Sequence, residues 1–112
     1  MLLFKAEHVP MILSGRKTQT RRLWPKGKRV NVGSVQQART RMLDASSTFA
    51  RLHVKRVWQE RLGDISDADA QAEGYADAGG YLLAFCRINR VERQRASGLV
   101  VWCVEFAKKE GA

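Results

Sequence analysis

The stretch 98–107 near the C-terminus constrains the fold most strongly. It reads G-L-V-V-W-C-V-E-F-A and is apolar on both faces except at Glu105. Strands that are buried on both sides read as continuous apolar runs, whereas strands with one solvated face alternate. We therefore expect 98–107 to be a strand at the centre of a sheet or barrel.

An alternating segment, T-F-A-R-L-H-V-K-R-V-W at 48–58, predicts a second long strand. The apolar residues from Ala50 to Val54 share one face, because successive side chains of a strand point to opposite sides. Val57 then falls out of phase, and a one-residue slip turns side chains to the other face unless a bulge absorbs it. The pattern predicts a β-bulge near Lys55–Arg56.

Shorter signals predict the remaining elements. We expect strands at 2–5, 17–24, 29–33 and 35–39, a loop at 43–47, and helices at 8–14, from Ser66 to the stop at Gly74, and at 80–90. This order predicts an α+β fold, in which a small and mostly antiparallel β-barrel carries two or three flanking helices. The length predicts that residues 1–112 form a single domain.

Positive charge is concentrated in the first part of the chain. The formal net charge is +9; residues 1–43 hold ten basic residues and one acidic residue, whereas 44–112 hold ten of each. A segregated excess favours a basic face that attracts a polyanion such as RNA or a nucleotide. A solvated basic surface without a partner is the alternative.

The sequence contains few signals for other function classes. Cys86 and Cys103 are the only cysteines, and we expect two reduced thiols rather than a disulfide. No apolar run is long enough to span a membrane and no targeting segment is recognisable, so we expect a cytoplasmic protein. His8 and His53 are isolated, and glycine-rich phosphate loops are missing. We therefore expect no metal and no cofactor; the oligomeric state stays open.

A cationic motif, G-R-K-T-Q-T-R-R at 15–22, places four cations around two threonines. If this segment continues as a strand, Thr20 and Arg22 point to the same face. Lys17 lies three residues before Thr20, so on a regular strand it would point to the opposite face. Its long side chain can still reach Thr20 from the preceding turn. The motif therefore predicts an amine, a hydroxyl and a guanidinium at one place.

Such a cluster could bind an anion or activate a nucleophile. Burial and neighbouring cations lower the pKa of Lys17, and a neutral lysine can take a proton from the Thr20 hydroxyl. Arg22 can hold a carboxylate, a phosphate or a pyrimidine carbonyl. Glu73, just before the Gly74 stop, is the candidate acid. The alternative is that these residues have no site role. Lys17 and Arg22 would then be surface cations, Thr20 a residue that favours a strand, and Glu73 a solvated residue at a helix end.

The sequence resembles the ASCH domain, a member of the PUA-like barrel group. Its pattern G-x-K-x-x-T-x-R is matched by Gly15, Lys17, Thr20 and Arg22. The runs I-S-D-A-D-A-Q-A-E-G-Y at 65–75 and V-V-W-C-V-E-F at 100–106 are similar to a second family feature and to the closing strand. The resemblance spans roughly residues 1–107 and implies a bent barrel with a cleft between strands and helices.

The resemblance implies an RNA-binding module, an RNA-related regulator, a metal-independent ribonuclease or an amidohydrolase acting on N4-acetylated cytidine. In the amidohydrolase branch it implies Lys17 as base, Thr20 as nucleophile, Glu73 as proton donor or orienting acid, and Arg22 as substrate-binding residue. The basic first part favours RNA, because a free nucleoside has no phosphate. A non-catalytic RNA-binding module is the alternative, and a protein-interaction subunit with an acidic partner is the third interpretation.

Further RNA-binding candidates surround the motif. Trp24 and Tyr75 could each stack a base, or could be core residues. The cations expected to contact RNA are Arg16, Arg21, Lys26, Lys28 and Arg29.

Overall fold

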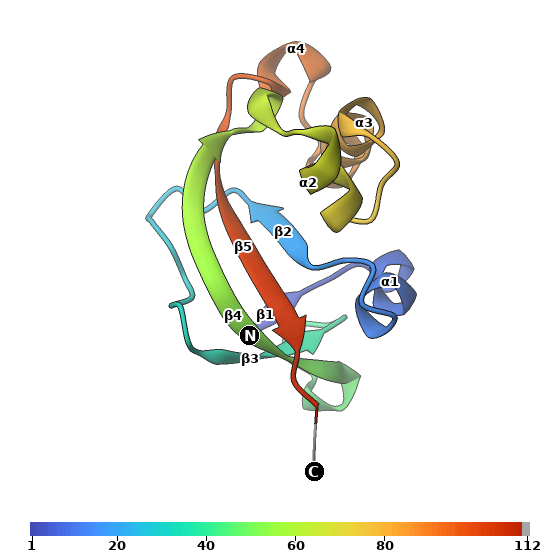
Figure 1. Ribbon diagram of the computed structural model, residues 1–112. Helices are drawn as coiled ribbons and strands as arrows, with labels where there is room; N and C mark the ends of the chain where they lie inside the picture. The colour runs from blue at the N-terminus through green and yellow to red at the C-terminus, as the bar shows by residue number, and fades with distance from the viewer. Residues whose placement is uncertain (111–112) are drawn as a thin grey trace.

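A curled five-stranded sheet in the order β1-β3-β4-β5-β2 is the framework of the protein (Figure 1). The computed structural model describes residues 1–110. The strands are β1 (Leu2–Leu3), β2 (Gln19–Arg22), β3 (Val35–Arg39), β4 (Thr48–Arg61) and β5 (Val100–Lys108). The β1–β3 pair is parallel and the other three pairs are antiparallel. The mostly antiparallel α+β fold is confirmed, in the form of a half-barrel with β1 and β2 at its edges.

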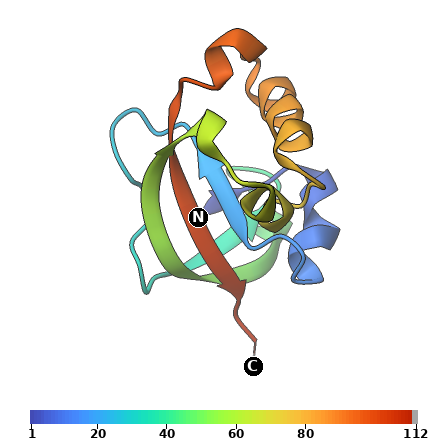
Figure 2. The same cartoon turned by 45° about the horizontal axis from the view of Figure 1, so that its top comes forward.

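Short helices connect the strands. They are η1 (Ala6–His8), α1 (Val9–Leu13), η2 (Ala45–Ser47), η3 (Leu62–Asp64), α2 (Asp67–Ala72), α3 (Ala78–Asn89) and α4 (Arg93–Ala96). Figures 1 and 2 show α1, α2 and α3 on the same side of β2, with α4 beyond the start of β5. Polar caps begin three of them: Asp44 accepts from the Ser46 amide at 2.9 Å, Ser66 from the Asp69 amide at 3.0 Å, and Asp77 from the Gly80 amide at 2.8 Å.

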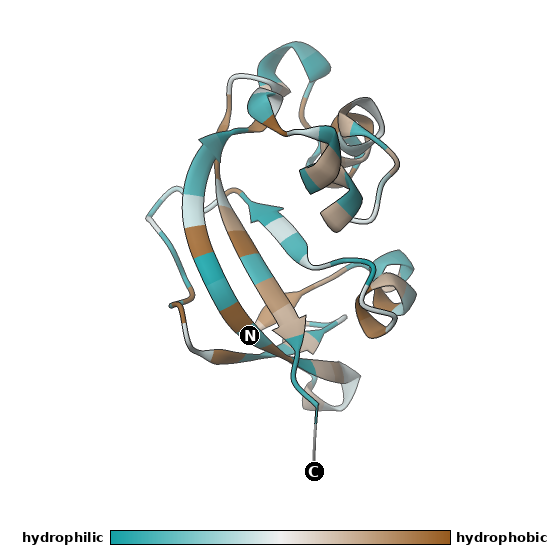
Figure 3. Ribbon diagram, viewed as in Figure 1, coloured by the Kyte–Doolittle hydropathy of each residue, from teal (hydrophilic) through white to brown (hydrophobic). Residues whose placement is uncertain are grey.

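The bulge in β4 sits where the sequence predicts it. Leu52 and Val54 are fully buried, the register between β4 and β5 shifts between Val54 and Arg56, and Val57 then packs on the same core as Leu52. Figure 3 shows the resulting alternation of apolar and polar bands along the strand. Because a bulge increases local twist and bending, it lets the long strand β4 curve between its two partners, with β3 paired along its first part and β5 along the rest.

Two apolar clusters lie on opposite faces of the sheet. The half-barrel encloses the first, around Phe4, Leu52 and Phe106, and the helices cover the second, around Tyr81 and Cys103. The strand β5 contributes to both clusters through alternate residues, which confirms that 98–107 contains a central buried strand. Cys86 and Cys103 are free thiols, as expected.

One predicted strand and several boundaries differ from the structure. Residues 29–33 form bends and a turn rather than a strand, because Gly33 has φ +89° and the chain reverses there. The alternation that suggested a strand arises because Val30 packs into the first cluster while Val32 is exposed. A 3₁₀ turn (η2) lies inside the predicted 43–47 loop, and the short α4 was not predicted. Within residues 1–110, no helix has the length and apolar character needed to cross a membrane.

Candidate functional site

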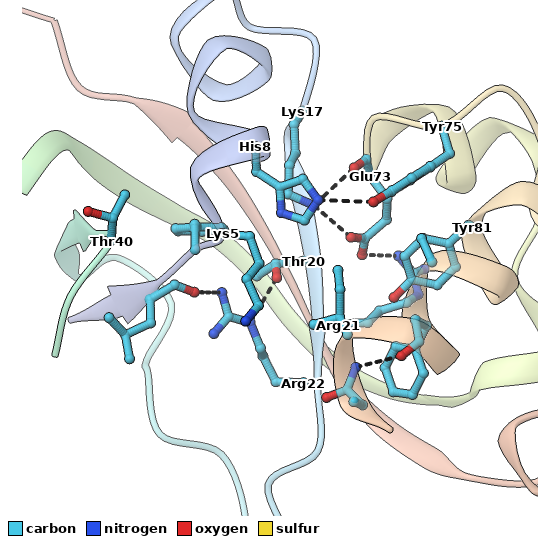
Figure 4. Close-up of a pocket in the computed structure, with 16 residues that line it drawn as sticks. Lys5, His8, Lys17, Thr20, Arg21, Arg22, Thr40, Glu73, Tyr75 and Tyr81 are labelled. Carbon is cyan, nitrogen blue, oxygen red and sulfur yellow. Dashed lines mark hydrogen bonds and ion pairs between the residues drawn. The ribbon is translucent and has the colours of Figure 1, made fainter. Parts of the chain in front are cut away.

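A cavity of about 250 Å³ lies between β2, the N-terminal segment and the helices α2 and α3 (Figure 4). Segments far apart in the sequence meet here: residues 3–8, the cationic motif, Thr40, the end of α2, and one face of α3. Six of the predicted site residues line this cavity: Lys17, Thr20, Arg21, Arg22, Glu73 and Tyr75.

A buried ion pair joins the cationic motif to the end of α2. Lys17 Nζ donates to Glu73 Oε1 at 2.8 Å and to the Glu73 carbonyl at 3.0 Å. Both side chains are only 2% exposed. A lysine ammonium has three N–H donors, so one remains for a ligand.

The backbone around Gly74 allows this pair to form. Glu73 is the C-cap of α2, and Gly74 follows with φ +99°, a conformation that favours glycine. A Cβ at Gly74 would lie 2.6 Å from the Met11 sulfur of α1. The Thr18 amide also donates to the Ala72 carbonyl at 2.7 Å. The end of α2 is therefore held close to both α1 and the motif.

Burial determines the protonation behaviour of Lys17. Desolvation lowers its pKa, the Glu73 carboxylate raises it part of the way back, and Arg22 and Arg21 lower it again, with a net lowering. The amine therefore loses its proton more easily than an exposed lysine does. This direction agrees with the expectation from the sequence.

Arg21 holds the second oxygen of Glu73. Its Nη1 donates to Glu73 Oε2 at 2.9 Å, and its Nη2 lies 2.8 Å from Glu60 and 3.3 Å from Asp69. The Arg21 side chain is 0% exposed. Each carboxylate oxygen of Glu73 thus accepts from a cation, which is the arrangement of an ionised carboxylate. The Arg21 guanidinium is occupied by three carboxylates.

Arg22 orients the threonine hydroxyl. Its Nε donates to Thr20 Oγ1 at 2.9 Å and its Nη2 donates to the Leu3 carbonyl at 2.6 Å, while the guanidinium lies 4.9 Å from the centre of the Phe4 ring. The Thr20 hydroxyl is an acceptor in this contact, so its own proton is available to a base or a ligand. No hydrogen bond joins Lys17 directly to Thr20 among the described residues.

A histidine that the sequence analysis left isolated also belongs to the cavity. His8 Nε2 lies 3.0 Å from the Tyr75 hydroxyl, and the two rings meet edge-on. Burial, followed by the charge of Lys17, lowers the pKa of His8 to about 4. The ring is therefore neutral near pH 7. Only folding brings position 8 against position 75, so no local pattern could have indicated this pair.

The remaining predicted RNA contacts do not line this cavity. The loop that follows β2 runs on the other side of β4 from the helices (Figures 1 and 2). It carries Lys26, Lys28 and Arg29, which are exposed. Trp24 is partly buried against the first cluster, and Arg16 borders a separate, shallow hollow beside Gln71. Within residues 1–110, no three His, Cys, Asp or Glu side chains are placed to hold a metal ion.

A half-barrel with helices across its β2 edge and a polar cavity between them is an α+β fold. A structure of a protein from Enterococcus faecalis, of family model DUF984, is similar to this chain with a TM-score of 0.68 and 17% identity, covering 92% of this chain and 67% of that one. An ASCH domain from Lactobacillus crispatus is similar with a TM-score of 0.65 and 16% identity, covering 89% and 69%. No family model and no curated protein match the sequence. The chain therefore has the ASCH-domain fold, as the resemblance in G-x-K-x-x-T-x-R implied.

Proposed function

We propose that this ASCH-fold protein binds a nucleoside or an RNA segment in the cavity and hydrolyses it without a metal ion. The preferred reaction is deacylation of an N4-acylated cytidine, and cleavage of RNA is the other hydrolytic form. One observation carries the proposal. Lys17 from a turn, Thr20 from a strand and Glu73 from a distant helix end line one cavity of about 250 Å³.

The size and walls of the cavity support a ligand of this class. Small-molecule pockets commonly have about 300–1,000 Å³, so 250 Å³ suits one base or a small nucleoside rather than several nucleotides. Phe4, Tyr81 and Phe85 supply aromatic wall, and Lys17 and Arg22 supply hydrogen-bond donors. Flat apolar walls with a few donors fit a planar ring that carries carbonyl groups.

The Lys17–Glu73 pair can generate the base. Transfer of one proton along the 2.8 Å contact from Nζ to Oε1 leaves a neutral amine and a neutral acid, with no change in the net charge of the site. Burial lowers the pKa of Lys17, which favours loss of its proton. The amine then accepts the Thr20 proton as Thr20 Oγ1 forms a bond to the acyl carbon.

The remaining steps return the site to its starting state. The bond between the acyl carbon and N4 breaks, and N4 takes the proton from Lys17, which releases cytidine. A water then adds to the acyl-threonine with Lys17 again accepting its proton. The bond to Oγ1 breaks as Lys17 gives that proton to Thr20 Oγ1, which releases the carboxylic acid. The proton on Glu73 Oε1 then returns to Lys17 Nζ and restores the ion pair. Arg22 holds Thr20 through Nε, while its remaining N–H groups bind the ligand.

The basic loop supports the alternative, a non-catalytic RNA-binding module. Lys26, Lys28 and Arg29 are exposed on a loop that β4 separates from the helices around the cavity. Cations contribute to RNA binding by neutralising phosphates, which requires exposure and no cavity. The two surfaces can therefore be tested separately.

Turnover assays distinguish hydrolysis from binding alone. Purified protein is incubated with N4-acetylcytidine and with single-stranded RNA, in the presence of a chelator. We expect turnover that is lost in Lys17→Ala and in Thr20→Ala and kept in Lys55→Ala, a matched change at an exposed lysine outside the cavity. RNA binding without turnover of either substrate would instead support the module.

Salt-dependent binding tests the basic loop. Changing Lys26, Lys28 and Arg29 together to Gln should weaken RNA binding and reduce its salt slope by about 0.7 for each phosphate that the loop no longer neutralises. Nucleoside turnover should stay at the wild-type level. Arg93→Gln with Arg95→Gln on α4 is the control for loss of charge alone. Unchanged affinity and slope in the loop variant would refute the polyanion interpretation.

A further inference from the structure

Tyr81 on α3 carries a hydroxyl without a protein partner. Its side chain is 4% exposed, yet the hydroxyl makes no hydrogen bond to another residue within 1–110. Every fully buried side-chain N or O atom in this range has a partner. The Tyr81 hydroxyl is therefore not sealed in the core, and it borders the cavity that Tyr81 lines beside Glu73 (Figure 4).

The neighbouring tyrosine, Tyr75, has the hydrogen bond that the Tyr81 hydroxyl lacks. Buried tyrosines normally find a hydrogen-bond partner, because the O–H otherwise loses its water without replacement. Tyr75 does so through His8 at 3.0 Å. The Tyr81 ring packs edge-on against Tyr75, with ring centres 5.7 Å apart, and at a tilt against Phe85, with ring centres 6.2 Å apart, so it is held by packing alone. Its position is thus fixed while its hydroxyl stays available.

The free groups in this part of the cavity are hydrogen-bond donors. Lys17 has one N–H left and Thr20 has its O–H, whereas both oxygens of Glu73 already accept from cations. Burial raises the pKa of Tyr81, so the phenol keeps its proton and acts as a donor. A ligand that satisfies these groups must present an acceptor, such as a carbonyl oxygen.

We propose that Tyr81 is a further catalytic residue, which donates a hydrogen bond to the carbonyl oxygen of the acyl group under attack. The inference rests on the proposed deacylation and names its substrate class: a neutral planar base that carries an acyl carbonyl. As Thr20 Oγ1 bonds to the acyl carbon, the carbonyl π pair moves onto oxygen. Tyr81 stabilises that oxyanion without giving up its proton, and the pair returns when the bond to nitrogen breaks.

The variant Tyr81→Phe removes only the hydroxyl and keeps the ring that packs on Tyr75 and Phe85. Removal of one oxyanion donor typically lowers kcat by about 10²–10³-fold, so we expect at least about a 10²-fold loss on N4-acetylcytidine. KM should change by less than about threefold, because the contact strengthens mainly in the transition state. The melting temperature should stay close to that of the wild type. Ser34→Ala, a hydroxyl deletion outside the cavity, should leave kcat unchanged.

A ligand without the carbonyl gives a second readout that does not depend on the variant. N4-ethylcytidine, used as an inhibitor of the wild type, has no carbonyl for Tyr81 to contact, so its ground-state binding should stay within about threefold of that of N4-acetylcytidine. Its inhibition constant should not change in Tyr81→Phe. A wild type that turns over N4-acetylcytidine while Tyr81→Phe shows the same kcat would overturn this inference alone. A wild type that neither binds nor turns over the nucleoside would overturn both this inference and the deacylation on which it rests.

Discussion

Glu73→Gln tests the buried charge arrangement at its centre. The change keeps the shape of the side chain and removes its charge, so Lys17 and Arg21 both lose an anionic partner. Arg21 retains Glu60 at 2.8 Å and Asp69 at 3.3 Å. Lys17 has no second carboxylate partner within residues 1–110. The destabilisation should therefore come mainly from an uncompensated lysine.

The expected loss follows from the cost of leaving a buried charge unpaired. Breaking a buried ion pair by removing one partner costs about 3–5 kcal/mol. We expect about 3 kcal/mol for Glu73→Gln at pH 7, since Lys17 can relieve the cost by losing its proton. Lys17→Met should cost about 1 kcal/mol, because Glu73 keeps Arg21 and an apolar chain fills the space. The double variant should be no less stable than Glu73→Gln, which makes the two changes strongly non-additive.

The pH dependence of stability has a definite sign. Burial lowers the pKa of Lys17 below its ordinary 10.5, so between the folded pKa and 10.5 the unfolded chain binds more protons than the folded one. Stability therefore rises with pH in that window, by at most about 1.4 kcal/mol per pH unit. In Glu73→Gln the carboxylate that raises the pKa of Lys17 is gone, so the free energy of unfolding should begin to rise at a lower pH. In Lys17→Met this contribution should be absent.

Urea unfolding followed by tryptophan fluorescence at several pH values between 7 and about 10 measures these free energies. The expected stability order at pH 7 is wild type, Lys17→Met, then Glu73→Gln. The reasoning fails if Lys17→Met is the less stable single variant, or if it keeps the full pH slope of the wild type.

Three further changes test the elements that build the site. Ser66→Ala removes the cap that accepts from the Asp69 amide at 3.0 Å and should cost about 1 kcal/mol in urea unfolding; an unchanged midpoint would contradict the capping role. Gly74→Ala forces a side chain into φ +99° and toward the Met11 sulfur, so it should cost more than about 1 kcal/mol and reduce nucleoside turnover, and wild-type values for both would argue against the close approach. Leu52→Ala empties a fully buried position and should cost about 2–5 kcal/mol without altering the KM of the folded fraction, as measured by unfolding and kinetics together.

Local patterns predicted the parts of the fold that depend on neighbouring residues. The apolar run at 98–107 indicated β5, the phase slip after Val54 indicated the bulge, and Ser66 with Gly74 bounded α2. The alternation at 29–33 wrongly predicted a strand for an equally local reason, because Val30 is buried although its backbone forms a bend and not a strand. The closeness of Lys17 and Thr20 was expected from the motif itself, and Glu73 was the candidate acid. No local pattern could place that carboxylate beside the motif, because 56 positions separate the lysine from the glutamate.

By itself the sequence determined the strand pattern, the helix boundaries of the middle region and the face shared by Thr20 and Arg22, because each depends on residues within a few positions of one another. Tertiary structure alone decided that Arg21 is bound by carboxylates, that His8 meets Tyr75, and that the Tyr81 hydroxyl is left without a partner. These features depend on which surfaces the curled sheet and its helices bring together. Burial at those contacts then sets the charge and hydrogen bonding of each group.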